Sequence, residues 1–345
     1  MQKEQIILNL EKLGKLFSAI AENEGSLLDE SMKPHFVSGV ELIDRLRHEN
    51  SWFTRTSVEF ALKSWSSALQ KVKLEKWLSN YNLTTPSKKV GVIMAGNIPL
   101  VGLHDAISVL VAGHQLHAKL SSKDKTLMGF VLQVLASQSE AWKNQIVVGD
   151  RLNDIEMLIA TGSDNSARYF EYYFKDIKKI IRKNRTSVAI LNGNESQEEL
   201  DGLADDIFIH FGLGCRNITK VYLPESYDKD LLFGAFFKYK EYAEHNAYAN
   251  NYDYNKAVYL LNNIDLVENG FLLLKEDQGL HSPVGVLFYE YYTDLKDLKN
   301  QLDKQKEEIQ ARVGHDFEVP FGKSQSPQLW DYADGVDTLE FLTNS

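Results

Sequence analysis

The sequence has one cysteine, Cys215, among its 345 residues. A single thiol has no partner for a disulfide within the chain. An N-terminal export signal is also missing, because charged residues interrupt the apolar ones throughout residues 1–15. Apolar runs such as Val109 to Gly113 are far too short to cross a bilayer. These absences favour a cytoplasmic protein without a membrane span.

A surplus of basic residues is missing as well. Lys and Arg number 38 against 48 Asp and Glu, which gives a net charge of −10 at pH 7. Because a nucleic-acid-binding face must neutralise phosphates, we expect no nucleic-acid partner. A phosphate-bearing ligand would need a local basic pocket. The composition, 43% hydrophobic and 25% charged, is that of a soluble globular protein, and the length suggests two domains.

The first part of the chain is expected to be helical, and the next part mixes strands with helices. Residues 1–85 place apolar side chains at helical spacing. From Lys89 onward, we expect strands over residues 89–96, 115–120, 145–148, 156–160 and 188–191, and helices over residues 100–113, 125–137 and 163–174. This alternation predicts an α/β fold with a parallel sheet over residues 86–192.

A second α/β unit is expected over residues 193–325, followed by a C-terminal segment of residues 326–345. The patterns predict a helix over 198–207, a strand over 220–223, a long aromatic helix from 228, strands over 270–275 and 284–292, and a charged helix over 295–312. Ligands of parallel sheets bind at the carboxyl ends of the strands, so residues that follow each strand are the first candidates for a site.

Asn97 follows the first strand of the parallel sheet, in the run Ala95-Gly96-Asn97-Ile98-Pro99. Its side-chain amide would point into the ligand crevice, where a neutral N–H donor can hold an oxyanion. The alternative is a helix N-cap, a position that asparagine also favours.

Two further strand ends carry residues suited to phosphate or ribose. Lys119-Leu120-Ser121-Ser122 offers an ammonium and two hydroxyls, and its alternative is a solvated turn. Thr161-Gly162-Ser163 opens a helix, where free N–H groups and the helix dipole favour an anion. Its alternative is ordinary helix capping.

Cys215 follows two glycines, Gly212 and Gly214, in the run Phe211-Gly-Leu-Gly-Cys-Arg-Asn217. Glycines leave one side of the thiol open to another molecule, which makes Cys215 a candidate nucleophile. The alternative is a buried structural thiol. No metal site is expected, because His114 and His117 lack further ligands nearby in the sequence.

These motifs, taken in order, resemble those of the aldehyde dehydrogenase superfamily. The resemblance rests on Asn97-Ile98-Pro99, Lys119-Leu120-Ser121-Ser122, Thr161-Gly162-Ser163 and Gly212-Leu213-Gly214-Cys215. Within the superfamily, Gly214-Cys-Arg-Asn-Ile-Thr-Lys-Val-Tyr-Leu-Pro224 is similar to the LuxC-like fatty-acid reductases, a family of acyl-CoA reductases. The resemblance implies a Rossmann-type cofactor domain followed by an α/β catalytic domain.

The resemblance also implies roles for individual residues. Cys215 would be the nucleophile, with Asn97 and the Cys215 backbone N–H holding the oxyanion. The cofactor would lie against Met94, Gly96, Lys119, Ser121, Ser122, Thr161, Gly162 and Ser163. Ser122 stands where NAD-preferring members carry a glutamate, so the implied cofactor is NADPH.

Two departures from the superfamily bear on the reaction. Its hydrolytic glutamate would fall within Ile180-Ile181-Arg182-Lys183-Asn184, which contains no acid, and its ribose-binding glutamate would fall near Gly279. Without the first acid an acyl-enzyme should resist hydrolysis. The expected reaction is therefore NADPH-dependent reduction of an acyl-CoA, or another acyl thioester, to the aldehyde. The alternatives are aldehyde oxidation to the acid and a non-catalytic binding role, and the implied partners are a second copy of the chain or an acyl-protein synthetase.

Overall fold

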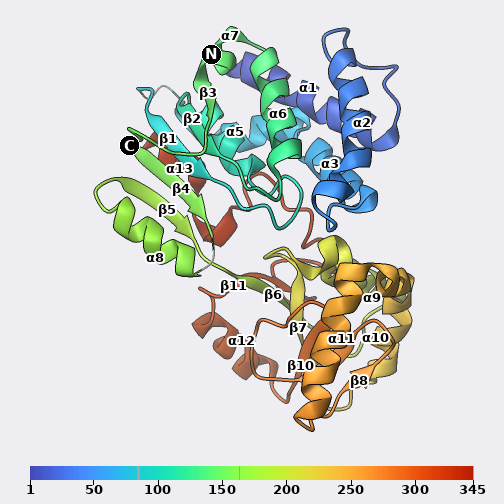
Figure 1. Cartoon of the computed structure of the whole chain (residues 1–345). Helices are drawn as coiled ribbons and strands as arrows, with labels where there is room; N and C mark the ends of the chain where they lie inside the picture. Colours follow the sequence, from blue (N-terminus) through green and yellow to red (C-terminus); the bar gives the residue numbers. More distant parts are fainter. Residues whose placement is uncertain (84–85, 163, 345) are drawn as a thin grey trace. The chain divides into compact units, whose positions relative to one another are not determined.

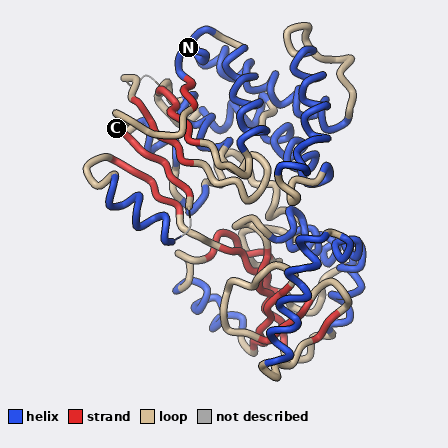
Figure 2. Tube along the Cα trace, viewed as in Figure 1, coloured by secondary structure: helices blue, strands red, loops and turns tan. Residues whose placement is uncertain are grey.

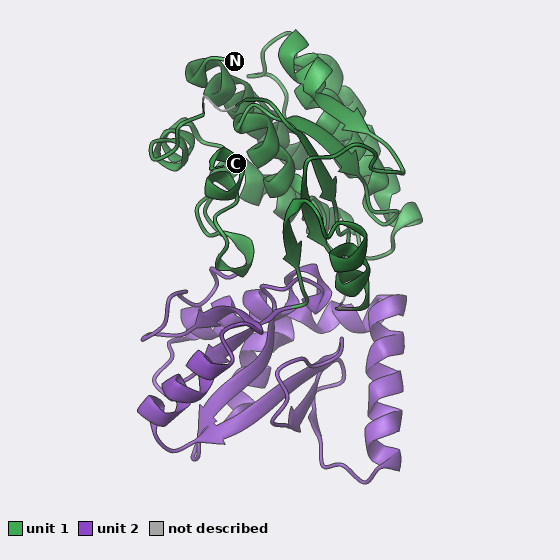
Figure 3. Cartoon of the chain, turned by 90° about the vertical axis from the view of Figure 1, so that its left-hand side faces the viewer, with its two compact units in different colours: residues 1–184, 327–345 green, residues 185–326 purple. Residues whose placement is uncertain are grey.

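The computed structural model describes residues 1–83, 86–162 and 164–344. Two compact units divide the chain, as Figure 3 shows in colour. The first comprises Met1–Asn184 together with Pro327–Ser345, and the second comprises Arg185–Ser326. The N-terminal helices, the first sheet and the C-terminal segment thus form one unit, and its boundary precedes the strand expected over residues 188–191.

Four helices begin the first unit: α1 (Lys3–Glu22), α2 (Lys33–Glu49), α3 (Arg55–Ala68) and α4 (Lys71–Leu78). The apolar stripe of α1, which includes Leu10, Leu13 and Phe17, is fully buried. Helix α1 packs against the other three helices, so this stripe forms the centre of the helical layer. The spacing of apolar residues that predicted helices here is the same spacing that buries them.

The first sheet is parallel throughout and has the strand order β3-β2-β1-β4-β5. Its strands are β1 (Lys89–Ile93), β2 (Gln115–Lys119), β3 (Ile146–Val148), β4 (Met157–Thr161) and β5 (Lys178–Arg182). The chain adds β2 and β3 on one side of β1 and then β4 and β5 on the other. A topological switch point therefore lies between β1 and β4, where open α/β sheets bind ligands.

The connections β1–β2, β2–β3 and β4–β5 contain helices, as expected for parallel strands, whereas β3 leads to β4 through a loop. These helices are α5 (Leu103–Val111), α6 (Lys125–Ser137), α7 (Glu140–Gln145) and α8 (Asp164–Tyr173). Figure 1 labels them around the strands, and Figure 2 distinguishes the helices in blue from the strands in red.

The C-terminal segment completes the first unit. Its helix α13 (Thr338–Thr343), which follows a short turn η3 (Ala333–Gly335), packs against α5. Trp77 donates a 2.9 Å hydrogen bond to the Tyr332 hydroxyl, and a ring nitrogen of His114 lies 3.0 Å from the carbonyl oxygen of Leu342. The buried His114 thus holds the end of the chain in place.

The second unit contains a six-stranded sheet of order β11-β6-β7-β10-β9-β8. Its strands are β6 (Thr186–Ile190), β7 (Ile218–Pro224), β8 (Val267–Glu268), β9 (Leu273–Glu276), β10 (Val286–Tyr292) and β11 (Ile309–Val313). All neighbours are parallel except β8 and β9. The helical segments are α9 (Gln197–Phe208), η1 (Ile209–Gly212), α10 (Lys229–Phe236), η2 (Phe237–Glu244), α11 (Asn246–Leu261) and α12 (Leu295–Lys304).

Three sequence expectations for these elements were wrong. The charged helix ends at Lys304 rather than Arg312, because Ile309, Ala311 and Val313 alternate inward as strand β11. The long aromatic helix is divided by the 3-10 segment η2. Strand β5 was not expected, because it is a short edge strand whose sequence begins with two lysines and does not have the apolar pattern of a buried strand. Among the described residues, no helix has both the length and the apolar character needed to span a bilayer.

Candidate active site

The predicted cofactor residues of the first unit gather at the carboxyl edge of its sheet. Ile93 pairs with Lys119 on one side and with Ala160 on the other, so β1, β2 and β4 end at the same level. Asn97, Ser122 and Gly162 follow these ends directly. The structure therefore brings together the three motifs that are separated by dozens of residues in sequence. Ser163 lies outside the described residues.

Gly96 is needed for the contact between two of these loops. A Cβ atom at Gly96 would lie 2.5 Å from Ser121 Oγ, a distance that no side chain tolerates. The glycine thus lets the loop after β1 touch the loop after β2. Met94 is buried in the hydrophobic core, where its side chain lies against Gly102.

Asp124 closes the loop that carries Asn97. Its Oδ2 accepts a 2.8 Å hydrogen bond from the backbone N–H of Leu100, a residue held at a φ of 59°. The carboxyl is buried, and its Oδ1 has no hydrogen-bond partner among the described residues. Burial raises the pKa of Asp124 to about 7. No sequence rule pointed to this residue, because its contact spans two loops.

Lys119 and Ser122 are both exposed at this edge, and Asn97 is half-buried. An exposed ammonium and an exposed hydroxyl at the same edge of the sheet are donors that suit a phosphate group. Thr161 is the last residue of β4, and the N–H of Gly162 donates to the carbonyl oxygen of Arg182 at 3.3 Å. This N–H is therefore not one of the free helix-start donors expected for an anion, and the side chains of Lys119 and Ser122 are the donors that suit an anionic dinucleotide.

Arg182 ends β5 in the segment 180–184, where the sequence has no acid. Its guanidinium is buried and donates to Asp105 Oδ1 at 2.7 Å. Further hydrogen bonds reach the Ala333 carbonyl oxygen at 2.7 Å and Thr338 Oγ1 at 2.9 Å. This guanidinium therefore joins α5 to the C-terminal segment, and as a permanent cation it cannot accept a proton.

Cys215 is exposed on a turn at the amino end of β7. The alternative of a buried structural thiol is therefore wrong. Asn217 is fully buried beside it, and its Oδ1 accepts a 2.8 Å hydrogen bond from the N–H of Gly214. Ser187 Oγ donates to the Cys215 carbonyl oxygen at 3.0 Å. The thiol thus projects from a turn whose backbone is fixed from both sides.

The chain enters this turn through a strained backbone. His210 and Phe211 have φ values of 58° and 59°, and Gly212 follows at 75°. Left-handed residues other than glycine cost on the order of 1–2 kcal/mol each. The Phe211 ring offsets this strain by stacking on Tyr242 at 4.4 Å and on His245 at 4.5 Å between ring centroids. Burial lowers the pKa of His210 to about 4, so the ring is neutral at pH 7.

An apolar pocket of about 20 Å³ lies beside the turn, within the second unit. Its lining includes Phe208, Phe211, Tyr248, Leu272 and Val284. This volume holds one water molecule or one methyl group. The pocket extends between the end of α9 and the loop before β10.

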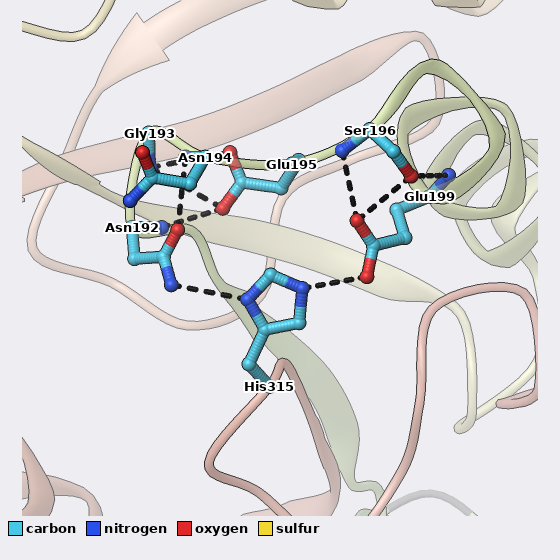
Figure 4. A network of polar contacts seen from close by, with 7 residues as sticks. All are labelled: Asn192, Gly193, Asn194, Glu195, Ser196, Glu199 and His315. Atoms are coloured by element: carbon cyan, nitrogen blue, oxygen red, sulfur yellow. Dashed lines mark hydrogen bonds and ion pairs between the residues drawn. The ribbon is translucent and has the colours of Figure 1, made fainter.

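Figure 4 shows a polar network at the opposite, carboxyl end of β6. Glu195 accepts hydrogen bonds from the N–H groups of Asn192 at 2.6 Å and Gly193 at 3.2 Å. The His315 ring bridges Asn192, at 3.0 Å, to Glu199, at 2.6 Å. These contacts fix the loop that leads into α9.

Three side chains of the second unit could serve as a base in place of the missing acid: Glu195, Glu276 and His281. The contacts of the strands show which of them lies at the same edge of the sheet as Cys215. Ser187 at the start of β6 contacts the Cys215 carbonyl, whereas Glu195 follows the far end of that strand. Glu276 is the last residue of β9 and so also belongs to the carboxyl edge. His281 is exposed and follows Leu280, whose carbonyl accepts from Thr219 near the start of β7. Of these three, His281 shares the edge of the sheet with Cys215.

Asn97 belongs to the first unit and Cys215 to the second. Sequence reasoning identified both of them, but it missed Asn217, Ser187 and Asp124. The side chains of these three residues bind backbone groups, either in the same turn or far away in the sequence. Contacts of this kind produce no regular spacing of residues that could be recognised in the sequence.

Comparison with known proteins identifies the fold. No family model and no curated protein matches the sequence. Among solved structures, aldehyde dehydrogenase 21 of Physcomitrella patens, in complex with the reaction product succinate, superposes with a TM-score of 0.67 and 12% identity, over 100% of this chain and 84% of that one.

Two further solved structures agree with this match. The propionaldehyde dehydrogenase from the fucose utilisation microcompartment of Clostridium phytofermentans gives a TM-score of 0.58 at 12% identity, over 94% of this chain and 82% of that one. The NAD⁺ complex of an aldehyde dehydrogenase from Bacillus cereus gives 0.57 at 11% identity, over 91% and 72%. The chain therefore has the aldehyde dehydrogenase fold.

Proposed function

We propose that this protein is a nicotinamide-dependent oxidoreductase that reduces an acyl thioester to the aldehyde through an acyl group carried on Cys215. The observation that carries the proposal is the exposed thiol of Cys215 on a fixed turn of an aldehyde dehydrogenase fold. A strained and strongly braced approach to the thiol is typical of a functional site.

The chain's own residues would act in a defined order. The Cys215 thiolate attacks the carbonyl carbon of the thioester, and Asn97 donates a hydrogen bond to the oxyanion that develops. When the tetrahedral species collapses, the carrier leaves as a thiol with the proton that Cys215 lost. The acyl group is then attached to the Cys215 sulfur.

A nicotinamide cofactor, when bound, supplies the hydride for the reduction. Lys119, Ser121 and Ser122 would hold its adenosine ribose and phosphate. Thr161 and Gly162 would lie against its pyrophosphate, with the Thr161 hydroxyl as the donor. Asn97 stabilises the oxygen of the resulting hemithioacetal. The carbon–sulfur bond then breaks, the aldehyde leaves, and Cys215 returns as the thiolate.

The cofactor proposed is NADPH. A 2′-phosphate would meet the exposed Lys119 ammonium and the Ser122 hydroxyl, and no carboxylate is present at position 122 to repel it. The NAD⁺ bound to the Bacillus cereus neighbour supports a nicotinamide cofactor in general. The preference for NADPH rests on the side chains of this chain alone.

Reduction is favoured over hydrolysis by a missing acid. The hydrolytic glutamate of the superfamily would fall within residues 180–184, which contain no acid. Without such a base, the acyl group on Cys215 should persist until the hydride arrives. Oxidation of aldehydes to acids would need such a base.

The product distinguishes these two activities. The protein is incubated with acyl-CoAs from acetyl to hexadecanoyl, with and without NADPH, and both aldehyde and free acid are quantified. We expect aldehyde to form with NADPH, and free acid to form far more slowly whether or not NADPH is present. Free acid formed as fast as aldehyde would refute the proposal, and His281→Ala would then be the first variant to test as the hydrolytic base.

A further inference from the structure

We infer that Asn217 is a positioning residue that fixes the direction of the Cys215 thiol, with Ser187 as its second support. This inference rests on the proposed function, because it assigns a role in acyl transfer to residues that touch neither substrate nor cofactor.

The side chain of Asn217 uses both ends of its amide. The oxygen Oδ1 accepts from the N–H of Gly214, the residue before Cys215. The nitrogen Nδ2 donates to the carbonyl oxygens of Ile209 at 2.7 Å, Asp206 at 3.1 Å and Ile207 at 3.1 Å. These carbonyls lie at the end of α9, where a helix leaves its last acceptors without intrahelical partners. One buried amide thus caps the helix and holds the cysteine turn.

Backbone contacts complete the support. The N–H of Asn217 donates to the Gly214 carbonyl oxygen at 3.0 Å, and the N–H of Ser187 donates to the Asn217 carbonyl oxygen at 3.3 Å. Ser187 Oγ reaches the Cys215 carbonyl oxygen. The peptide groups around Cys215 are therefore tied to α9 and to β6, which fixes the direction of the Cα–Cβ bond that carries the exposed thiol.

The support under Asn217 is itself rigid. The Asp206 carboxylate accepts hydrogen bonds from the N–H of Gly322 at 2.7 Å, and from the N–H and the hydroxyl of Ser324 at 2.9 and 2.8 Å. A Cβ atom at Gly202 would lie 2.9 Å from the Gly322 nitrogen, so this segment lies directly on α9. Asn217 donates to the carbonyl oxygen of Asp206. The contacts that hold Asp206 in place therefore also hold the turn that carries Cys215.

No other side chain matches this set of partners. Aspartate would place an anion against three carbonyl oxygens, and alanine would leave the Gly214 N–H and three carbonyls without their partner. The strained His210 and Phe211 lie between the helix end and the turn, so loss of Asn217 should let this segment relax. The thiol would remain exposed but would lose its direction.

The test uses Asn217→Ala and Ser187→Ala, with Asn9→Ala as the control for loss of a buried asparagine, since Asn9 lies in α1 of the first unit. Three rates are measured: acyl transfer from dodecanoyl-CoA to Cys215 by intact-protein mass spectrometry, alkylation of Cys215 by iodoacetamide, and hydrogen exchange at the Gly214 amide. Because Cys215 is the single cysteine, alkylation reports on this thiol alone.

For Asn217→Ala we expect acyl transfer to fall by about 10²-fold, because orientation governs that step. Alkylation should stay within about threefold, because it follows exposure and thiolate fraction. The Gly214 amide should exchange faster. Ser187→Ala should show a smaller loss of the same kind and carries the test if Asn217→Ala does not fold. Asn9→Ala should match the wild type.

Acyl transfer at the wild-type rate in both variants would overturn the inference, as would equal losses in acyl transfer and alkylation. A wild type that accepts no acyl group would refute the proposed function instead. Exchange at Gly214 would then still decide whether Asn217 fixes the turn.

Discussion

Arg182 and Asp105 form a buried ion pair in the first unit, with Nη2 2.7 Å from Oδ1. The pair connects the last strand of the first sheet to α5, and the same guanidinium holds the C-terminal segment through Ala333 and Thr338. Arg182 thus has a structural role within the first unit, where it joins β5, α5 and the C-terminal segment.

Removal of one partner of this pair should be costly. Arg182→Ala leaves the Asp105 charge buried without its partner, and we expect the free energy of unfolding to fall by about 3–5 kcal/mol. Urea denaturation measures this. The double variant Arg182→Leu/Asp105→Leu should recover part of the loss, because it removes both charges. A single variant as stable as the wild type would contradict the structural role.

Asn97 should act on the transition state. Asn97→Ala removes a donor to the developing oxyanion, so kcat should fall by about 10²- to 10³-fold with little change in KM. Steady-state kinetics with an acyl-CoA and NADPH measure both constants. The N-cap of α5 is Gly102, so Asn97 does not cap that helix. If kcat stays at the wild-type value, Asn97 does not act on the oxyanion.

Cofactor preference should respond to two exposed residues. Ser122→Glu should shift preference toward NADH, because a carboxylate repels the 2′-phosphate. Lys119→Ala should weaken NADPH binding more than NADH binding. The ratio of the two dissociation constants, measured by fluorescence titration, checks both variants. A wild type that binds both cofactors equally would be incompatible with this assignment.

Asp124 should make stability depend on pH near neutrality. Its pKa is raised from 3.8 to about 7 by burial, so the folded state holds a proton that the unfolded state has lost between these values. The neutral Asp124 carboxyl therefore contributes its full share to the free energy of unfolding below about pH 4, and this contribution is lost as the pH rises through about 7. Between pH 5 and pH 7, the wild type should lose about 1.4 kcal/mol per pH unit relative to Asp124→Asn.

Denaturation curves of both proteins at several pH values test this expectation. Their stabilities are compared as a difference, because other groups titrate equally in the two proteins. A difference that does not change with pH would show that Asp124 is ionised in the folded protein.

The sequence was most informative about the first sheet, where strands and helices alternate regularly along the chain. The alternation of strands and helices from Lys89 onward predicted the parallel sheet, because parallel strands need crossover connections. Edge strands were harder. Strand β5 begins with two lysines, and β11 follows a charged helix, so their short alternations were masked by polar neighbours.

The candidate site divides in the same way. Asn97 and Lys119 stand at or just after strand ends, and Cys215 follows two glycines. Such positions can be recognised from sequence. Asn217 and Asp124 are buried polar residues whose partners are backbone groups, and burial of a single Asn or Asp has no local signature. The contacts of Asn217 and Asp124 can be recognised only in the folded structure.

The most direct test of the account is the fate of an acyl group on the single thiol. The wild type and Cys215→Ser are mixed with dodecanoyl-CoA in the absence of NADPH and followed by intact-protein mass spectrometry with peptide mapping. The account predicts one dodecanoyl group on the wild type, on Cys215, which persists until NADPH is added and then disappears as aldehyde forms. An unmodified wild type, an adduct elsewhere, or an adduct that hydrolyses as fast as NADPH removes it would contradict the account.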